Sequence, residues 1–336
     1  MTVTTTQKGT RTMTTTLRTI EKPPHGSLEW LMRRHRDESG RCVLGASDAP
    51  ALVDVSPFTS RADLFHSKST TPKVSEGTAA MQVGNILEPA LVAELGRRLG
   101  ATMHTPNTMY QRDRFIVSLD ALALSAGAPA VIGEVKTTRR HRIETIEDVP
   151  ADYLWQCWAQ MLVLERPVWL IVLDKDMNIS THEIPRNEQA LDVLRRDSQT
   201  FCTAVDERDA QLLADLSQQM TVEQIAELYR PPQPVERALT ADEYAWVREL
   251  ADARDLKRQA EQIEQAAKDH IARTMLDAEI ATFDGRKVLT WREQAGRSTL
   301  DVARLREAHP ELVAEFTTQG SPSRVMRLSN TKGNTQ

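Results

Sequence analysis

The chain has 336 residues, 40% of them hydrophobic and 26% charged, which is typical of a globular protein with one large domain or two smaller ones. It has no apolar stretch near the roughly 18 residues that a membrane span needs and no hydrophobic signal region, so we expect a cytoplasmic protein without membrane contacts. The net charge of −5 excludes a global positive field, so nucleic acid would have to be bound by local basic patches.

The N-terminal part of the chain indicates an α/β or α+β domain behind a disordered tail. The first 19 residues hold ten threonines and no acidic residue, so we expect residues 1–26 to stay disordered. The hydrophobic pattern that follows predicts helices near 27–36, 46–54, 78–99 and 151–165, and strands near 114–120, 130–137 and 168–174. We therefore expect one mixed domain over residues 27–230.

A proline-rich stretch, "LYRPPQPV" at residues 228–235, separates this domain from the rest of the chain. Apolar residues recur at steps of three or four from Trp246 to Met275, which predicts one long amphipathic helix over 240–278. A strand over 285–293, entered through a turn, and two short helices over 300–316 should follow. Residues 235–336 are thus expected to form a helical C-terminal extension.

Charged residues interrupt an apolar run in the predicted sheet, "VSLDALALSAGAPAVIGEVKTT" at residues 117–138. Because side chains alternate along a strand, Glu134 and Lys136 share one face. Asp120 ends the preceding strand, and its carboxylate reaches the same edge if the two strands pair. Two hard oxygen ligands with open positions for water and phosphate suit Mg²⁺, and a lysine beside them suits phosphoryl chemistry. The alternative is a solvated ion pair on the surface.

Five motifs and a helix with two glutamines follow one another in an order that resembles a known family. The motifs are "GASD" (45–48), "SPF" (56–58), "GNILEP" (84–89), "SLDA" (118–121) and "GEVKTT" (133–138), and the helix carries Gln156 and Gln160. Over residues 27 to about 175 the chain resembles the lambda-exonuclease-like, or YqaJ-type, viral alkaline exonucleases of the PD-(D/E)XK nuclease superfamily. The resemblance implies a central mixed sheet flanked by helices.

The resemblance also implies roles for single residues. Mg²⁺, with Mn²⁺ as a substitute, would be held by Asp120, Glu134, the backbone carbonyl of Val135 and Glu88. Lys136 would be the catalytic lysine, and Gln156 would lie beside the catalytic centre. The chain departs from the family pattern at Trp158 and Ala159, where glutamine and histidine are common.

Contacts with DNA are expected at two further places. Ser47 matches the family serine that helps to hold a terminal phosphate, and its arginine companion is Arg34, Arg36 or Arg41, of which we favour Arg41. The run "RRHR" at residues 139–142 offers Arg139 and Arg140 to the DNA backbone, since cationic side chains replace the counterions of phosphates. A solvated turn is the alternative for this run.

The function implied by the resemblance is a Mg²⁺-dependent exodeoxyribonuclease that degrades linear duplex DNA from its ends, 5′ to 3′, in a bacterial or phage-infected cell. Its partners would be DNA ends, a single-strand annealing recombinase and further copies of the chain, arranged in a ring. The alternatives are a structure-specific or restriction-type endonuclease on the same fold, and a catalytically inactive protein that binds DNA or recruits a recombinase.

Overall fold

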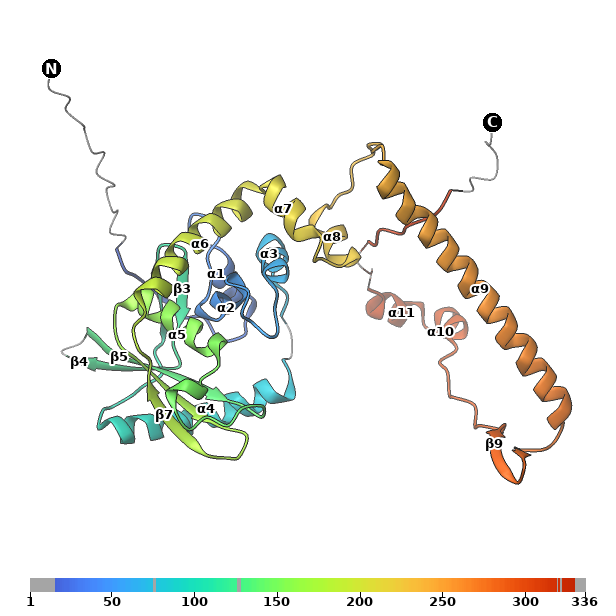
Figure 1. Cartoon of the computed structure of the whole chain (residues 1–336), viewed down its shortest axis with the longest axis horizontal. Coiled ribbons are helices and arrows are strands. Elements are labelled where there is room, and N and C mark those ends of the chain that lie inside the picture. The colour runs from blue at the N-terminus through green and yellow to red at the C-terminus, as the bar shows by residue number, and fades with distance from the viewer. Residues whose placement is uncertain (1–15, 75–76, 126–127, 319, 321, 330–336) are drawn as a thin grey trace, which may run out of the picture. The chain divides into compact units, whose positions relative to one another are not determined.

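The computed structural model describes residues 16–74, 77–125, 128–318, 320 and 322–329. The chain divides into two compact units between Arg230 and Pro231. The first unit carries two β-sheets with helices around them, and the second is mostly helical (Figure 1).

A three-stranded antiparallel sheet contains the first element that the structure describes. Its strands are β1 (Arg18–Glu21), β2 (Thr108–Arg112) and β3 (Phe115–Ser118), in the order β1-β2-β3. The disordered tail expected over 1–26 is therefore wrong for residues 18–21, which pair with β2, while residues 1–15 lie outside the described residues. Ile20 packs beside a small buried cluster with Trp30, and this contact orders the strand.

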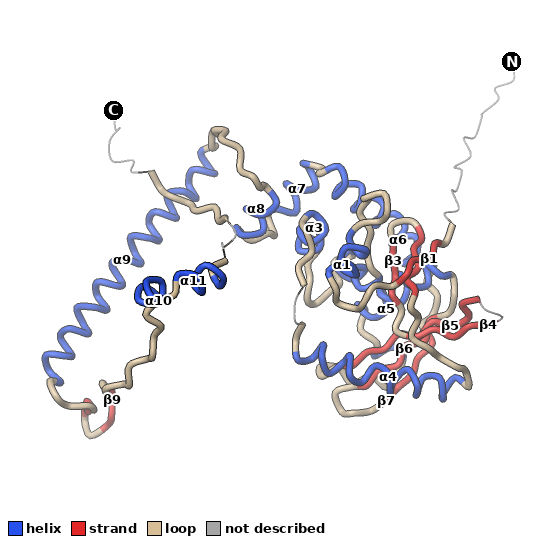
Figure 2. The backbone as a smooth tube through the Cα atoms, turned by 180° about the vertical axis from the view of Figure 1, so that it is seen from behind, coloured by secondary structure: helices blue, strands red, loops and turns tan. Residues whose placement is uncertain are grey.

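A four-stranded mixed sheet forms the centre of the first unit (Figure 2). Its strands are β4 (Ala121–Ser125), β5 (Ala128–Thr137), β6 (Val168–Leu173) and β7 (Ile179–Glu183), in chain order. β5 and β6 are parallel and the other pairs are antiparallel. The strands predicted near 114–120 and 130–137 do not pair with each other. β3 pairs with β2, and β5 pairs with β4, a strand that the pattern did not predict.

Two helices cover opposite faces of this sheet, so the expected mixed α/β class is confirmed. α4 (Ala79–Leu99) packs through Leu91 and Leu95 on a face that includes Val135. α5 (Ala151–Leu164) connects the parallel strands and packs in the main core on the other face. Gly133 permits the close approach of α4, since a Cβ atom there would lie 2.6 Å from Cδ2 of Leu95.

The remaining helices of the first unit complete the main core. They are α1 (Leu28–His35), the 3-10 turn η1 (Ala46–Asp48), α2 (Ala49–Leu52), α3 (Arg61–Ser69), the 3-10 turn η2 (Ile146–Asp148), α6 (Glu188–Glu207), α7 (Ala210–Ser217) and α8 (Val222–Leu228). α2 contacts α3, α5 and α6, and α6 contacts α3 and α5. The rings of Phe65 and Phe201 meet edge to face with centroids 5.9 Å apart.

The second unit contains a long helix, a strand after a turn and two short helices, as its pattern predicts, and one strand, β8 (Ile280–Phe283), that the pattern did not predict. The predicted elements are α9 (Ala241–Met275), β9 (Arg286–Thr290), α10 (Val302–Ala308) and α11 (Pro310–Phe316). Met275 is buried, whereas Trp246, Leu256 and Ile263 on the same helix are exposed. Across the described ranges of the chain, no helix combines the length and apolarity needed to cross a membrane.

Candidate active site

Asp120, Glu134 and Lys136 come together where β4 begins and β5 ends. Asp120 lies just before β4, and its Oδ2 accepts a hydrogen bond of 2.9 Å from the backbone N–H of Val135. The Glu134 side chain is 1% exposed, and its Oε1 accepts a hydrogen bond of 2.5 Å from Nζ of Lys136. The shared face of Glu134 and Lys136 thus follows from strand alternation, and Asp120 reaches it from the strand junction.

Two glutamines of α5 fix the carboxylate of Glu134. Gln156 donates from Nε2 to Oε1 at 2.5 Å, and Gln160, one helical turn later, donates from Nε2 to Oε2 at 2.5 Å. Gln156 also accepts a hydrogen bond of 3.0 Å from Nζ of Lys136. Gln160 was not among the predicted site residues, although its helical spacing from Gln156 shows that both lie on one face.

The site holds more negative charge than its lysine balances. Burial, followed by the charge of Glu134, raises the pKa of Asp120 to about 8. Burial opposes the charge of Lys136, but the carboxylates of Glu134 and Asp120 outweigh it and raise the lysine pKa. Burial also raises the pKa of Glu88, with Glu134 adding to the effect. A cation bound here would therefore be stabilised by its surroundings.

The oxygen atoms of the site fit a hard divalent cation. Asp120 and Glu134 supply two carboxylates, and burial, followed by the charge of Glu134, raises the pKa of Asp120, so a bound cation would favour its ionised form. Mg²⁺ is commonly bound by one or two carboxylates while it keeps several waters. Within the part of the chain that the structure describes, no three His, Cys, Asp or Glu side chains form a metal-binding group. Glu88 therefore shares the cavity with Asp120 without completing a three-carboxylate cluster.

A cavity of about 350 Å³ joins this centre to the "GASD" turn. Asp120, Glu88 and Gln156 line one part of it, and Arg34 and Ser47 line another. A larger cleft of about 880 Å³ overlaps it and adds Glu134 and Lys136 to the lining. The predicted catalytic residues and Ser47 therefore face a common space.

Arg34, and not Arg41, is the arginine beside Ser47. Nη2 of Arg34 donates to Oγ of Ser47 at 2.5 Å, and its guanidinium lies 4.4 Å from the centroid of the Trp30 ring. Arg41 instead forms an ion pair of 2.8 Å with Asp37. Arg36 is also excluded as the companion of Ser47, because its guanidinium donates to the backbone carbonyls of His35 and Lys68.

A buried ion pair supports the turn that carries Ser47. Nζ of Lys68 lies 2.8 Å from Oδ2 of Asp48 and donates at 2.8 Å to the backbone carbonyl of Arg34. The same Asp48 oxygen accepts a hydrogen bond of 2.7 Å from the N–H of Gly45. Lys68 thus connects α1 with the "GASD" turn and keeps Arg34 beside Ser47.

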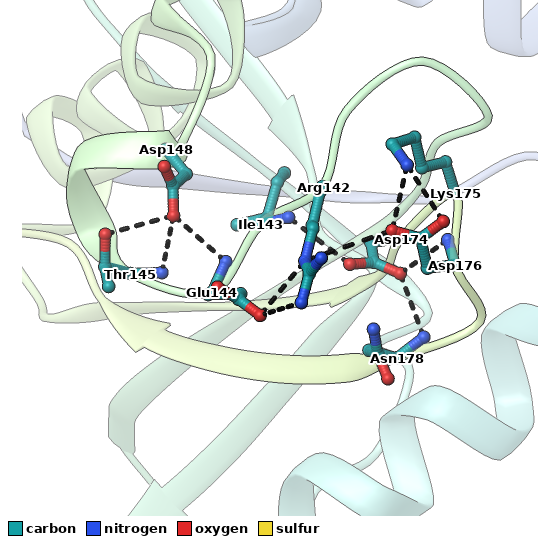
Figure 3. Close-up of polar contacts among 9 residues, drawn as sticks. All are labelled: Arg142, Ile143, Glu144, Thr145, Asp148, Asp174, Lys175, Asp176 and Asn178. Atoms are coloured by element: carbon teal, nitrogen blue, oxygen red, sulfur yellow. Dashed lines mark hydrogen bonds and ion pairs between the residues drawn. The ribbon is translucent and has the colours of Figure 1, made fainter.

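The arginines of the basic run after β5 differ in their contacts: Arg142 is paired with a carboxylate in the loop that follows (Figure 3). Asp174 accepts a hydrogen bond from the backbone N–H of Ile143, and Asp148 accepts one from that of Glu144, so both carboxylates anchor the loop. Arg142 is neutralised by Glu144, at 2.5 Å. Arg139 and Arg140 are exposed and take part in none of these contacts.

Comparisons with known proteins find similarity in the first unit of the chain. The profile of the YqaJ-like viral recombinase domain matches residues 29–167. No curated protein matches the chain at a significant level.

Three of the solved structures with some similarity are named as exonucleases. The alkaline exonuclease LHK-Exo from Laribacter hongkongensis is 16% identical, with a TM-score of 0.41, and covers 58% of this chain and 100% of its own. Its complex with dAMP gives 20% identity and a TM-score of 0.42, with coverages of 58% and 100%. A phage-related exonuclease from Haemophilus somnus 129PT is 13% identical, with a TM-score of 0.38 and coverages of 51% and 97%. The profile match thus covers the part of the first unit that carries the motifs and the candidate site, and the chain is similar there to the YqaJ-like viral recombinase domain.

Proposed function

We propose that the protein is a Mg²⁺-dependent deoxyribonuclease that degrades linear double-stranded DNA from its ends, 5′ to 3′. The observation that carries this proposal is a shared cavity, in which the Asp120 and Glu134 centre faces the Arg34–Ser47 pair. The match of residues 29–167 to the YqaJ-like viral recombinase domain supports a role in recombination.

The residues of the centre have separate roles in the proposed hydrolysis. Mg²⁺, or Mn²⁺ in its place, would be held by Asp120, Glu134 and the carbonyl of Val135, and it would supply Lewis acidity and a more acidic water. Lys136 presents a positive charge to the phosphate and orients the attacking water. Gln156 and Gln160 keep Glu134 in one orientation, which lowers the reorganisation needed during the reaction.

End recognition is assigned to Arg34 and Ser47. A guanidinium and a hydroxyl provide several hydrogen-bond donors at one place, and a terminal phosphate is an acceptor that matches them. Because the pair lines the same cavity as Asp120, a phosphate held there would place the adjoining nucleotide toward the centre. This arrangement favours an exonuclease over an endonuclease.

The test is digestion of end-labelled linear duplex beside covalently closed circular DNA, with Mg²⁺ and with chelator. We expect hydrolysis of the linear duplex alone, and only with metal. Glu134→Ala should slow it by more than the roughly 10- to 100-fold effect known for partners of metal ligands, while Glu188→Ala, an exposed carboxylate of α6, should not. Cleavage of the circle would favour an endonuclease, and no cleavage of either would favour a binding protein.

The proposal extends to the partners of the enzyme. The single strand left by the digestion would pass to a single-strand annealing recombinase, and the chain would assemble with further copies of itself. Exposed Trp246, Leu256 and Ile263 on α9 support association with another chain. Light scattering on the full-length protein, alone and with an annealing protein, would measure both associations.

A further inference from the structure

An aromatic side chain and an arginine form an exposed pair in the first unit. Phe58, in the turn between α2 and α3, is 70% exposed. The guanidinium of Arg140 lies 4.8 Å from the centroid of its ring. Arg140 belongs to the loop that follows β5, so the pair joins two segments distant in the sequence. Such high exposure means that Phe58 contributes little to the hydrophobic core.

Both residues are held by short hydrogen-bonded turns. Oγ of Ser56 accepts hydrogen bonds from the N–H groups of Phe58 at 3.3 Å and Thr59 at 3.2 Å. Oγ1 of Thr138 accepts one of 3.2 Å from the N–H of Arg140. These hydrogen bonds hold the backbone from which the ring and the guanidinium project, which reduces the entropy lost when a ligand binds.

The pair is connected to the catalytic centre through Thr138. Arg140 lies four residues after Lys136 in the sequence. Nζ of Lys136 lies 5.6 Å from the centroid of the Tyr153 ring, and the Tyr153 side chain is hydrogen-bonded to Thr138. DNA that follows the loop away from Lys136 would therefore reach Arg140 and Phe58.

The positive charge at this position is not neutralised. Among the residues that the structure describes, no carboxylate forms an ion pair with Arg139 or Arg140, in contrast to Arg142 of the same run. Unpaired guanidinium groups beside an exposed ring can bind a phosphate and stack on a base together.

We propose that Phe58 and Arg140 form a stacking platform for an unpaired nucleobase of the DNA strand that passes the catalytic centre. Arg140 covers one face of the ring, the base stacks on the open face, and Arg139 holds the adjacent phosphate. Every base has a π-face, so the platform would act without sequence preference. The inference rests on the proposed function, because it assigns the DNA strand a path through the same site.

Fluorescence of 2-aminopurine tests the platform without hydrolysis. Full-length protein in chelator is titrated with duplex carrying a short single-stranded end that contains 2-aminopurine, whose emission falls when it stacks. Wild type should quench the probe, and Phe58→Trp should retain the quenching. Phe58→Ala and Phe58→Leu should lose the quenching and bind about 5- to 100-fold more weakly. Tyr229→Ala, which removes another exposed aromatic side chain of the same unit, is the matched control.

The outcomes separate this inference from the proposed function. Unchanged quenching and affinity in Phe58→Leu would overturn the platform, even if wild type hydrolyses DNA. Contact with a protein partner would then be the alternative role of Phe58. Quenching that depends on Phe58 in a protein that hydrolyses no DNA would keep the platform and overturn the nuclease. Thermal unfolding of each variant shows whether lost binding reflects lost structure, and Phe58→Leu keeps the apolar surface of the turn.

Discussion

Replacement of Lys68 by methionine should destabilise the first unit through the carboxylate that it leaves behind. The side chains of Lys68 and Asp48 are 3% and 20% exposed, and the change removes the ammonium 2.8 Å from the carboxylate. Burial alone would raise the pKa of Asp48, but Lys68 and Arg34 outweigh it and lower the pKa. Breaking a buried pair destabilises by about 3–5 kcal/mol, and we expect about 3 because Asp48 keeps some solvent contact.

Urea and thermal unfolding would measure the effect. A loss of about 3 kcal/mol corresponds to a Tm lower by about 6 to 12 °C for a unit of this size. Lys73→Met is the matched control, since Lys73 is 78% exposed and its ion pair with Glu227 should contribute under about 1 kcal/mol. The double variant Lys68→Met/Asp48→Asn should recover part of the loss, because no buried charge remains. A Lys68→Met protein as stable as the Lys73→Met control would refute the reasoning.

Two further predictions concern the terminal phosphate and pH. Ser47→Ala and Arg34→Ala should each reduce the preference for 5′-phosphorylated over 5′-hydroxyl duplex by roughly tenfold, because charge-assisted hydrogen bonds are worth about 1.5–3 kcal/mol. Arg41→Ala is the control and should leave this preference unchanged. Equal rates of digestion from both kinds of end in wild type would contradict the prediction. Burial and then Lys68 lower the pKa of His35 to about 4. The unfolded chain therefore binds the proton more readily than the folded chain. As the pH falls from about 6.5 to 4, the contribution of His35 should lower the free energy of unfolding by on the order of 2 kcal/mol, and above about pH 7 this contribution should not change. A His35→Gln protein should lose this part of the pH dependence, and identical profiles for variant and wild type would exclude the assignment.

The elements that the sequence predicts well are the long apolar ones. The helix near 78–99 and the strands near 130–137 and 168–174 appear within a few residues of their expected bounds, because each buries a continuous apolar face. β4 was missed because its residues continue the apolar run of the preceding strand, and the chain changes sheets at Leu119 and Asp120 without a glycine or proline. β2 was missed because its buried face includes Gln111, which a hydrophobic pattern does not count.

The site could be predicted where its residues are close in the sequence. Glu134 and Lys136 share a face by strand alternation alone, and Gln156 and Gln160 by helical spacing. The arginine of Ser47 could not be chosen this way, because three arginines lie within eight residues and only the packing of α1 decides among them. Arg34 reaches Ser47 because it is one turn after Trp30, whose ring lies against the guanidinium.

The parallel pairing of β5 with β6 has a consequence for folding kinetics. Glu134 pairs in register with Leu170, and the chain between them must first form the crossover through α5. Pairings between residues distant in the sequence form slowly, because the loop between them must close before the contacts stabilise it. The glutamines that hold Glu134 lie on that crossover helix, so its carboxylate becomes desolvated only as the helix docks. A nascent chain therefore cannot assemble this centre until β6 has left the ribosome, well after both of its carboxylates have been synthesised.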